Sequence, residues 1–307
     1  MSAIQSVLAA LYLRGLQRPV EPHSRAWPAV LSLLRRASIG SALEAAEVLR
    51  GGGFSGEAAC LAGRALEHAE RLVESELVVT AASPFYPRAW VEKLGAGAPP
   101  ALYARGALEL LSTPCFGIVG SRNPPAKAFR TAVQVVEAAG NLGFTIVSGG
   151  APGIDRAAGA AEAFIEVWPG GLGLRWGARK QRSGPSLHLS IWPPRELFST
   201  AGAMERNTLV YALAQAAFVG HARFKQGGSW HGATSAFRRR LTRILVTAEP
   251  WTRADEPARR ALLGLGAIQL HGVVASELNK ALAAEPLQPW LPAFTHDPAI
   301  ASALAAY

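Results

Sequence analysis

The chain has 307 residues, of which 50% are hydrophobic, and a formal net charge of +9. This length accommodates one large domain and a smaller one, with enough apolar material for a packed core. It contains no run of about 18 apolar residues and no basic leader followed by a hydrophobic stretch, so we expect a soluble cytoplasmic protein without membrane association. Cys60 and Cys115 lie far apart without neighbouring ligand residues, which predicts neither a disulfide framework nor a metal site.

The positive charge is concentrated in one quarter of the chain. Residues 171–245 contain 12 Lys/Arg and 2 Asp/Glu, whereas the remainder holds 19 basic and 20 acidic residues. This local excess favours a polyanionic ligand such as nucleic acid. A coding bias toward arginine is the alternative, but such a bias would raise arginine everywhere and would not deplete the carboxylates of one region.

In chain order, residues 1–76 have apolar positions at helical spacing and predict a small helical module. Leu77–Thr80 is a candidate strand, followed by a connection rich in proline and aromatic residues. Strands and helices then alternate, which predicts an α/β core with a mostly parallel sheet over residues 77–274 and a helical tail over residues 275–307. The expected strands are 116–119, 144–147, 217–220, 244–247 and 267–270, and the expected helices are 126–139, 153–164, 204–216, 232–241 and 256–265. Residues 169–194 are interpreted as a long excursion from this pattern.

Four short segments marked by glycine or arginine predict one phosphate-binding pocket. In order they are Gly117-Ile-Val-Gly-Ser-Arg122, Ser148-Gly-Gly-Ala-Pro-Gly-Ile-Asp155, Arg206-Asn207 and Gly227-Gly-Ser-Trp-His-Gly-Ala233. The first two follow short β-branched runs and precede expected helices, where a parallel sheet presents backbone N–H groups to an anion. Each segment alone is compatible with an ordinary strand-to-helix turn.

Asp155 has two interpretations. In the first turn of a helix it can hold the preceding loop by accepting N–H bonds, and near a phosphate site it can also act in catalysis. No second carboxylate or histidine lies nearby in sequence, which favours the structural role. The run Pro169–Gly173 resembles the signature of the lysine-decarboxylase-like phosphoribohydrolases, but Leu174 and Gly177 stand where that signature has threonine and its acidic residue. We therefore expect no catalytic residues and no cofactor.

With these segments in place, the chain resembles the DprA/Smf DNA-processing family over about residues 77–270. The resemblance rests on Tyr86-Pro87, on the stretch from Pro99 to Gly106, on Gly266-Ala267 and on the four segments above. It implies an extended Rossmann-like sheet flanked by helices, binding of single-stranded DNA, a homodimer, and loading of the recombinase RecA during natural transformation. The chain departs from the family at Gly159, where histidine is typical, and at Thr208, where arginine is typical.

Two functions remain open from the sequence. The first is a non-enzymatic module that holds single-stranded DNA: Arg122 and Lys225 would contact phosphates, the glycines at 149–150 and 227–228 would donate N–H groups, and Trp176 and Trp230 would stack on bases, unless they are core residues. The second is an enzyme or sensor that binds a small nucleotide-derived ligand. The full set of expected phosphate-binding residues is Gly120, Ser121, Arg122, Ser148, Gly149, Gly150, Gly153, Asp155, Arg206, Asn207, Lys225, Gly227, Gly228, Ser229 and Trp230.

Overall fold

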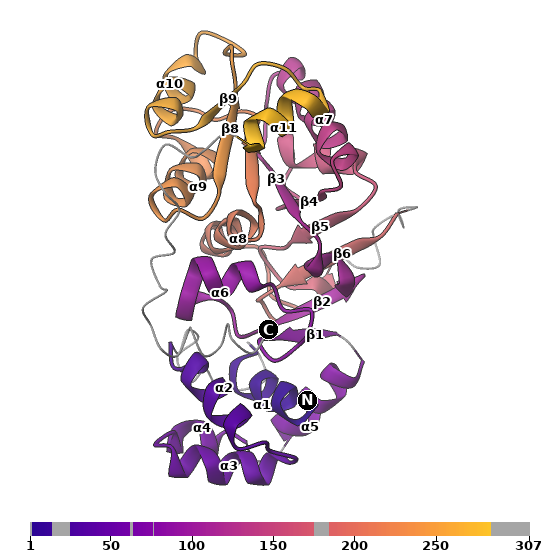
Figure 1. The fold of residues 1–307 in the computed structure, drawn as a ribbon, viewed down its shortest axis with the longest axis vertical. Coiled ribbons are helices and arrows are strands. Elements are labelled where there is room, and N and C mark those ends of the chain that lie inside the picture. Colours follow the sequence, from indigo (N-terminus) through magenta and orange to yellow (C-terminus); the bar gives the residue numbers. More distant parts are fainter. Residues whose placement is uncertain (1, 14–24, 62–63, 76, 175–183, 284–307) are drawn as a thin grey trace.

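The computed structural model describes residues 2–13, 25–61, 64–75, 77–174 and 184–283. An N-terminal helical module lies at one end of an elongated molecule, and a nine-stranded sheet with its covering helices forms the rest (Figure 1). The module contains α1 (Ser2–Tyr12), α2 (Trp27–Arg36), α3 (Ala42–Gly51), α4 (Ser55–Ala59) and α5 (Arg64–Glu74). Its core includes the fully buried side chains of Leu8, Trp27, Leu31 and Leu49, because apolar residues recur on one face of each longer helix.

The sheet has the order β1-β2-β6-β5-β4-β3-β7-β8-β9. Its strands are β1 (Val78–Thr80), β2 (Ala101–Gly106), β3 (Cys115–Val119), β4 (Thr145–Ser148), β5 (Phe164–Val167), β6 (Ser186–Ser190), β7 (Ala216–Val219), β8 (Arg243–Thr247) and β9 (Ile268–Leu270). The pairs β1–β2 and β2–β6 are antiparallel and all other neighbours are parallel. The predicted α/β class with a mostly parallel sheet is confirmed.

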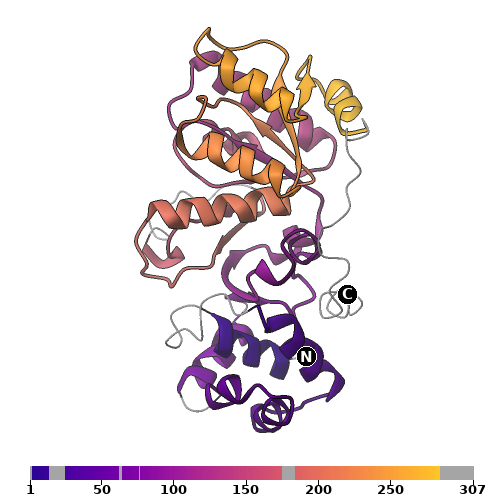
Figure 2. The same ribbon diagram turned by 90° about the vertical axis from the view of Figure 1, so that its left-hand side faces the viewer.

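Helices cover both faces of the parallel part of the sheet (Figures 1 and 2). On one face lie α7 (Ala126–Asn141), the 3₁₀ helix η3 (Ile154–Ala160) and α11 (Ala275–Ala283); on the other lie α8 (Thr200–Leu213), α9 (Gly227–Arg238) and α10 (Glu256–Gly264). The short α6 (Arg88–Leu94) packs near α8, where the Trp90 indole donates a hydrogen bond to the Leu209 carbonyl at 3.1 Å. Three further 3₁₀ turns are η1 (Gly95–Gly97), η2 (Leu108–Ser112) and η4 (Leu172–Leu174). None of the described helices is long and apolar enough to cross a membrane.

The strand order creates a switch point between β3 and β7. From β3 the chain adds β4, β5 and β6 successively on one side, and α8 then carries it back to β7 on the other side of β3. The loops that leave β3 and β7 therefore diverge to opposite faces of the sheet. In open α/β sheets, ligands bind in the crevice that this divergence opens at the carboxyl ends of the strands.

Three strands escaped the sequence analysis. β2 lies in the region interpreted as a connection, β6 lies inside the supposed excursion 169–194, and β5 follows a segment expected to be helical throughout. Residues 153–164 were expected to form one helix, but only Ile154–Ala160 is helical, in the 3₁₀ form, because Ala161 is already extended and Phe164 pairs with Ile146 of β4. Strand pairing thus overrides the local helical pattern of this alanine-rich segment.

Two helices begin earlier than expected. Helix α8 begins at Thr200, because the Ser199 hydroxyl caps it by accepting a hydrogen bond from the Gly202 amide at 2.9 Å. Helix α9 begins at Gly227, so the glycines expected to form a loop are in fact its first turn. Gly227 takes a φ of +72°, which glycine adopts without strain.

Candidate nucleic-acid interface

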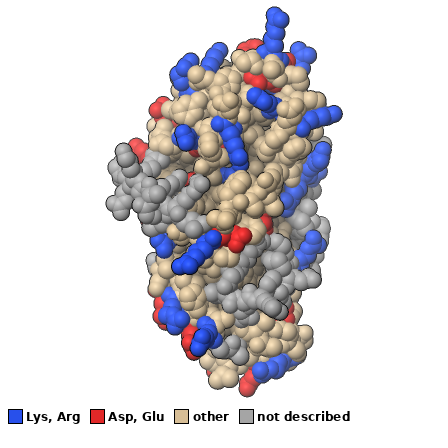
Figure 3. Space-filling model, turned by 180° about the vertical axis from the view of Figure 1, so that it is seen from behind, with Lys and Arg blue, Asp and Glu red and all other residues tan. Residues whose placement is uncertain are grey.

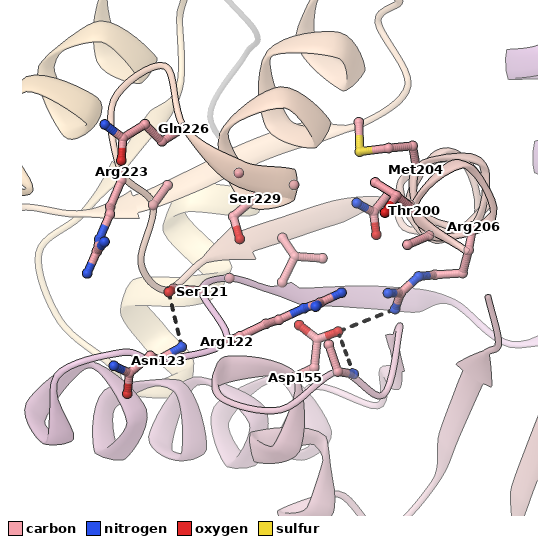
Figure 4. A pocket seen from close by; sticks show the side chains of 18 of the residues that line it. Ser121, Arg122, Asn123, Asp155, Thr200, Met204, Arg206, Arg223, Gln226 and Ser229 are labelled. Atoms are coloured by element: carbon pink, nitrogen blue, oxygen red, sulfur yellow. Dashed lines mark hydrogen bonds and ion pairs between the residues drawn. The ribbon is translucent and has the colours of Figure 1, made fainter. Parts of the chain in front are cut away.

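A pocket of about 610 Å³ opens at the switch point, where the loops after β3 and β7 meet the first half of α8 and the first turn of α9. Figure 4 shows side chains from these segments converging on it. It is lined by Val119, Gly120, Ser121, Arg122, Asn123, Ala151, Asp155, Phe198, Thr200, Ala203, Met204, Arg206, Asn207, Tyr211, Ala222, Arg223, Gln226, Gly227, Gly228 and Ser229. The four segments predicted from the sequence therefore all contribute to one pocket.

The loop after β3 is held on both sides. The Ser121 amide donates to the His221 carbonyl at 2.9 Å, and the Ile154 amide donates to the Ser121 carbonyl at 3.1 Å. Gly120 lines the pocket, but a Cβ there would lie 2.6 Å from Ile154, so this glycine also makes room for η3. A Cβ on Gly153 would lie 2.1 Å from the Ser121 carbonyl oxygen, which explains this glycine by packing rather than by contact with a ligand.

Arg122 is the exposed cation of this loop. Its side chain extends across the pocket toward Arg206 (Figure 4), and its guanidinium carbon lies 5.4 Å from the ring centre of Phe198. Such a cation–π contact leaves the N–H groups at the edge of the guanidinium free to bind an anion. The position of Arg122 is therefore compatible with the expected phosphate contact.

Asp155 lies buried at the wall of the pocket, with 6% of its surface exposed. Its Oδ2 accepts hydrogen bonds from the amides of Gly149 at 3.2 Å and Ala151 at 3.3 Å. Asp155 thus holds this loop, as the first of the two interpretations predicts. Burial raises the pKa of Asp155 to about 6, while Arg206 and the two amides act in the opposite direction.

Arg206 projects from α8 and is also buried, with 5% of its surface exposed. Its Nη1 lies 3.5 Å from Asp155 Oδ2, and its Nε is buried without a hydrogen-bond partner. Burial lowers the pKa of Arg206, and the nearby charge of Arg122 acts in the same direction. The pocket wall thus contains a guanidinium whose hydrogen-bonding capacity its protein contacts do not fill.

The glycines after β4 do not face the pocket as the sequence suggested. The Gly149 amide is bonded to Asp155 and the Gly150 amide to the Ser148 hydroxyl at 3.3 Å, so neither is available to a phosphate. A Cβ on Gly149 would lie 0.9 Å from Arg206 Nη1, and one on Gly150 would lie 1.6 Å from Glu166 Oε1. These glycines, together with the buried Ser148, provide space for the charged side chains behind the pocket.

The first turn of α9 supplies the backbone donors instead. Gly227, Gly228 and Ser229 line the pocket, and the preceding Gln226 makes no side-chain cap. The first N–H groups of a helix have no partner inside the helix and carry partial positive charge, which suits an anion. Asn207 lies against this turn, since its Nδ2 would be 3.7 Å from a Cβ on Gly228.

Two residues expected in the site lie elsewhere. Lys225 is exposed but is not part of the pocket lining, and its Nζ lies 5.2 Å from the ring centre of Phe224. Trp230 is only 8% exposed and packs edge-to-face against Phe224 at 5.0 Å, so it is a core residue in this structure and offers no free ring face for stacking. Trp176 falls outside the described residues.

The sequence analysis missed Phe198 and Arg223, which both line the pocket. Phe198 is 52% exposed, so this large apolar side chain is open to solvent beside a charged pocket. The available signal was its place directly before the Ser199 cap, in the segment that leads to Arg206. Arg223 follows β7 closely, at the switch point where a cation can reach the crevice.

The glycine run at the start of the segment 169–194 supports the loop that carries Phe198. The Gly171 amide donates to the Glu196 carbonyl at 2.8 Å, and the Gly173 amide donates to the Pro194 carbonyl at 2.9 Å. A Cβ on Gly171 would lie 2.0 Å from the Pro193 carbonyl oxygen. This run therefore packs against residues 193–197. Its function in this structure is to support that loop, although its sequence resembles an enzyme signature.

The exposed basic residues on the face in Figure 3 do not merge into one patch. On the face in Figure 3, Lys and Arg side chains are spread over the surface with carboxylates between them. Part of the basic surplus is Arg206, which is buried, and part is Arg238, Arg239 and Arg240, which are exposed at the end of α9. Within the described residues, no group of three His, Cys, Asp or Glu side chains is arranged to hold a metal ion.

A Rossmann-like sheet with arginines and a helix N-terminus around its switch-point crevice defines an α/β protein suited to a phosphate-bearing ligand. The chain belongs to the family of DNA recombination-mediator protein A, whose family model matches residues 77–272. It resembles the structure of DNA processing protein A from Helicobacter pylori, with 23% identity, a TM-score of 0.56, and coverage of 67% of this chain and 95% of that one. It also resembles DNA processing protein A from Streptococcus pneumoniae, with 18% identity, a TM-score of 0.64, and coverage of 91% and 98%. No curated protein sequence matches the chain.

Proposed function

We propose that this protein binds single-stranded DNA through the switch-point pocket, without catalysing a reaction. The observation that carries this proposal is the convergence of Arg122, Arg206 and the uncapped first turn of α9 on one pocket of about 610 Å³. All three favour the phosphates of a nucleic-acid backbone. The Helicobacter pylori relative has a single-stranded DNA binding mode, which supports the same ligand here.

The exposed ring of Phe198 favours a single strand over a duplex. Bases of a single strand are free to stack on an aromatic side chain, whereas the bases of a duplex are already stacked and paired. Phe198 lies beside Arg122, so one nucleotide can place its phosphate on the guanidinium and its base near the ring. This arrangement needs no contact with base edges and predicts weak dependence on sequence.

We extend the proposal to the role that the family implies. The protein would act in the cytoplasm as a homodimer and transfer the bound strand to a RecA-type recombinase during DNA uptake. Binding by backbone contacts and stacking suits such a transfer, because it holds any sequence and leaves the base edges free for pairing. Pull-down of a recombinase on a single-stranded oligonucleotide, with and without this protein, tests the transfer separately from DNA binding.

The test of DNA binding is an anisotropy titration of single- and double-stranded oligonucleotides at several salt concentrations. Four to six phosphate contacts on a single strand give a slope of log K against log salt of about −3 to −4. A slope near zero, or equal affinity for a duplex, would contradict the proposal. Saturable binding of a mononucleotide without salt-sensitive binding of oligonucleotides would instead favour a sensor or enzyme for a small nucleotide.

A further inference from the structure

We propose that Asp155 competes with the DNA phosphate for Arg206, so that the Asp155 carboxyl group takes up a proton when DNA binds. The inference rests on the proposed function and concerns its regulation. It starts from the position of Asp155 and Arg206, which are both buried and both line the pocket. A phosphate that approaches Arg206 therefore also brings negative charge close to Asp155.

The bond between Asp155 and Arg206 is poorly suited to exclude an anion. The distance of 3.5 Å between Nη1 and Oδ2 is the longest of the three contacts to that oxygen, which also accepts the amides of Gly149 and Ala151. Arg206 Nε has no partner. The guanidinium can therefore turn from the carboxylate to a phosphate that satisfies more of its N–H groups.

The groups around Asp155 favour its neutral form once a phosphate is bound. Glu166 of β5 adds negative charge nearby and is itself paired with His188 of β6, whose Nδ1 lies 3.2 Å from Glu166 Oε2. Tyr211 of α8 lies near the carboxyl, and Arg122 faces Arg206 from the loop after β3. With Arg206 shared with a phosphate, two buried carboxylates would remain close together with less compensation, and protonation of one relieves this.

The direction of the linkage follows from these charges. In the free protein, burial already raises the pKa of Asp155 to about 6. A bound phosphate raises it further, so the complex holds more protons than the free protein between the two pKa values, and affinity increases as pH falls through that window. Above the pKa of the complex, and below that of the free protein, affinity is independent of this group.

The experiment is a titration of fluorescent oligothymidylate, whose bases do not ionise in this range, at constant salt from about pH 8 to about pH 5.5. We expect binding about 3- to 30-fold tighter at the acidic end, and no more than about tenfold per pH unit for one proton. Asp155→Asn keeps an oxygen for the two amides and removes the charge. It should abolish the pH dependence and bind DNA about 3- to 30-fold more tightly than wild type at about pH 8.

His231 provides the matched control, because it is an ionisable side chain that is exposed on α9 outside the pocket lining. His231→Gln should retain the pH dependence. If Asp155→Asn retains the pH dependence, or binds DNA more weakly than wild type while folding normally, Asp155 is only a structural residue and the inference is wrong.

If the variant fails to fold, calorimetry of the wild type in two buffers of different ionisation enthalpy counts the protons directly, and a count of zero near about pH 6.5 overturns the inference. Binding at every pH with constant affinity refutes the linkage alone, whereas no binding at any pH refutes the proposed function.

Discussion

Arg206 in α8 and the three arginines at the end of the neighbouring α9 carry the same kind of charge in different surroundings. Arg206 in α8 is buried, lies 3.5 Å from Asp155 and faces a pocket. Arg238, Arg239 and Arg240 at the end of α9 are exposed, and Arg239 donates a long hydrogen bond of 3.5 Å to the Thr208 hydroxyl. The first is positioned before any ligand arrives, whereas side chains of the second kind lose conformational freedom when they bind. Local charge density in the sequence does not distinguish the two.

The largest expected effect is that of Arg206→Ala on stability. The substitution leaves Asp155 buried without its cation, and we expect a loss of about 2–3 kcal/mol in the free energy of unfolding at neutral pH. Because Arg206 lowers the pKa of Asp155, its removal raises that pKa above the wild-type value of about 6, so the loss should shrink as pH falls toward about 6 and stay constant below it. Urea unfolding at two pH values measures this, with Arg239→Ala as the control. Equal stability of the two variants would remove the distinction between the buried and exposed arginines.

Arg122→Ala should weaken DNA binding without affecting folding. A charge-assisted hydrogen bond from a side chain to a phosphate contributes about 1.5–3 kcal/mol, so we expect a loss of about 10- to 150-fold in affinity. Arg130→Ala is the matched control, because Arg130 is exposed on α7 and is not part of the pocket lining. Wild-type affinity in Arg122→Ala would place the DNA path outside the pocket.

Phe198→Ala tests whether the exposed ring contacts a base. Stacking of one base contributes about 1–3 kcal/mol, so affinity for a normal single strand should fall about 5- to 150-fold. An abasic strand of the same length should bind wild type and variant equally, because it has no base to stack on the ring. Leu197→Ala controls for general loss of apolar surface, since Leu197 is 73% exposed and does not line the pocket. Equal weakening on the abasic strand would mean that Phe198 acts by positioning Arg122.

The smallest effect is expected for Arg239→Ala. An exposed cation that is held only by one long hydrogen bond contributes less than about 1 kcal/mol to binding of the DNA backbone. We expect nearly unchanged affinity at moderate salt and a salt slope that is less steep by about 0.7, because one phosphate fewer is neutralised. A larger loss of affinity than in Arg122→Ala would reverse the comparison and indicate that DNA runs over the end of α9.

The strands and loops that depend on local patterns could be predicted from the amino-acid sequence. β-branched runs followed by glycine and a helical pattern located β3 and β4, and the order of the four marked segments predicted one pocket. The loop-holding role of Asp155 was the interpretation that the sequence favoured, and the amides that it accepts, those of Gly149 and Ala151, lie only six and four residues before it. These interactions span a few residues, so their pattern is visible in the chain.

Which groups are available to a ligand depends instead on packing between distant segments. Strands β5 and β6 form because they pair with each other and with their outer neighbours, β5 with β4 and β6 with β2, long-range interactions that no local pattern displays. Trp230 is buried against Phe224, whereas Phe198 is exposed at the pocket, although either aromatic could stack on a base. Likewise the amides of Gly149 and Gly150 are already bonded, whereas the first turn of α9 lines the pocket. The neighbours that cover or expose each group come from distant parts of the chain, so only the folded structure reveals them.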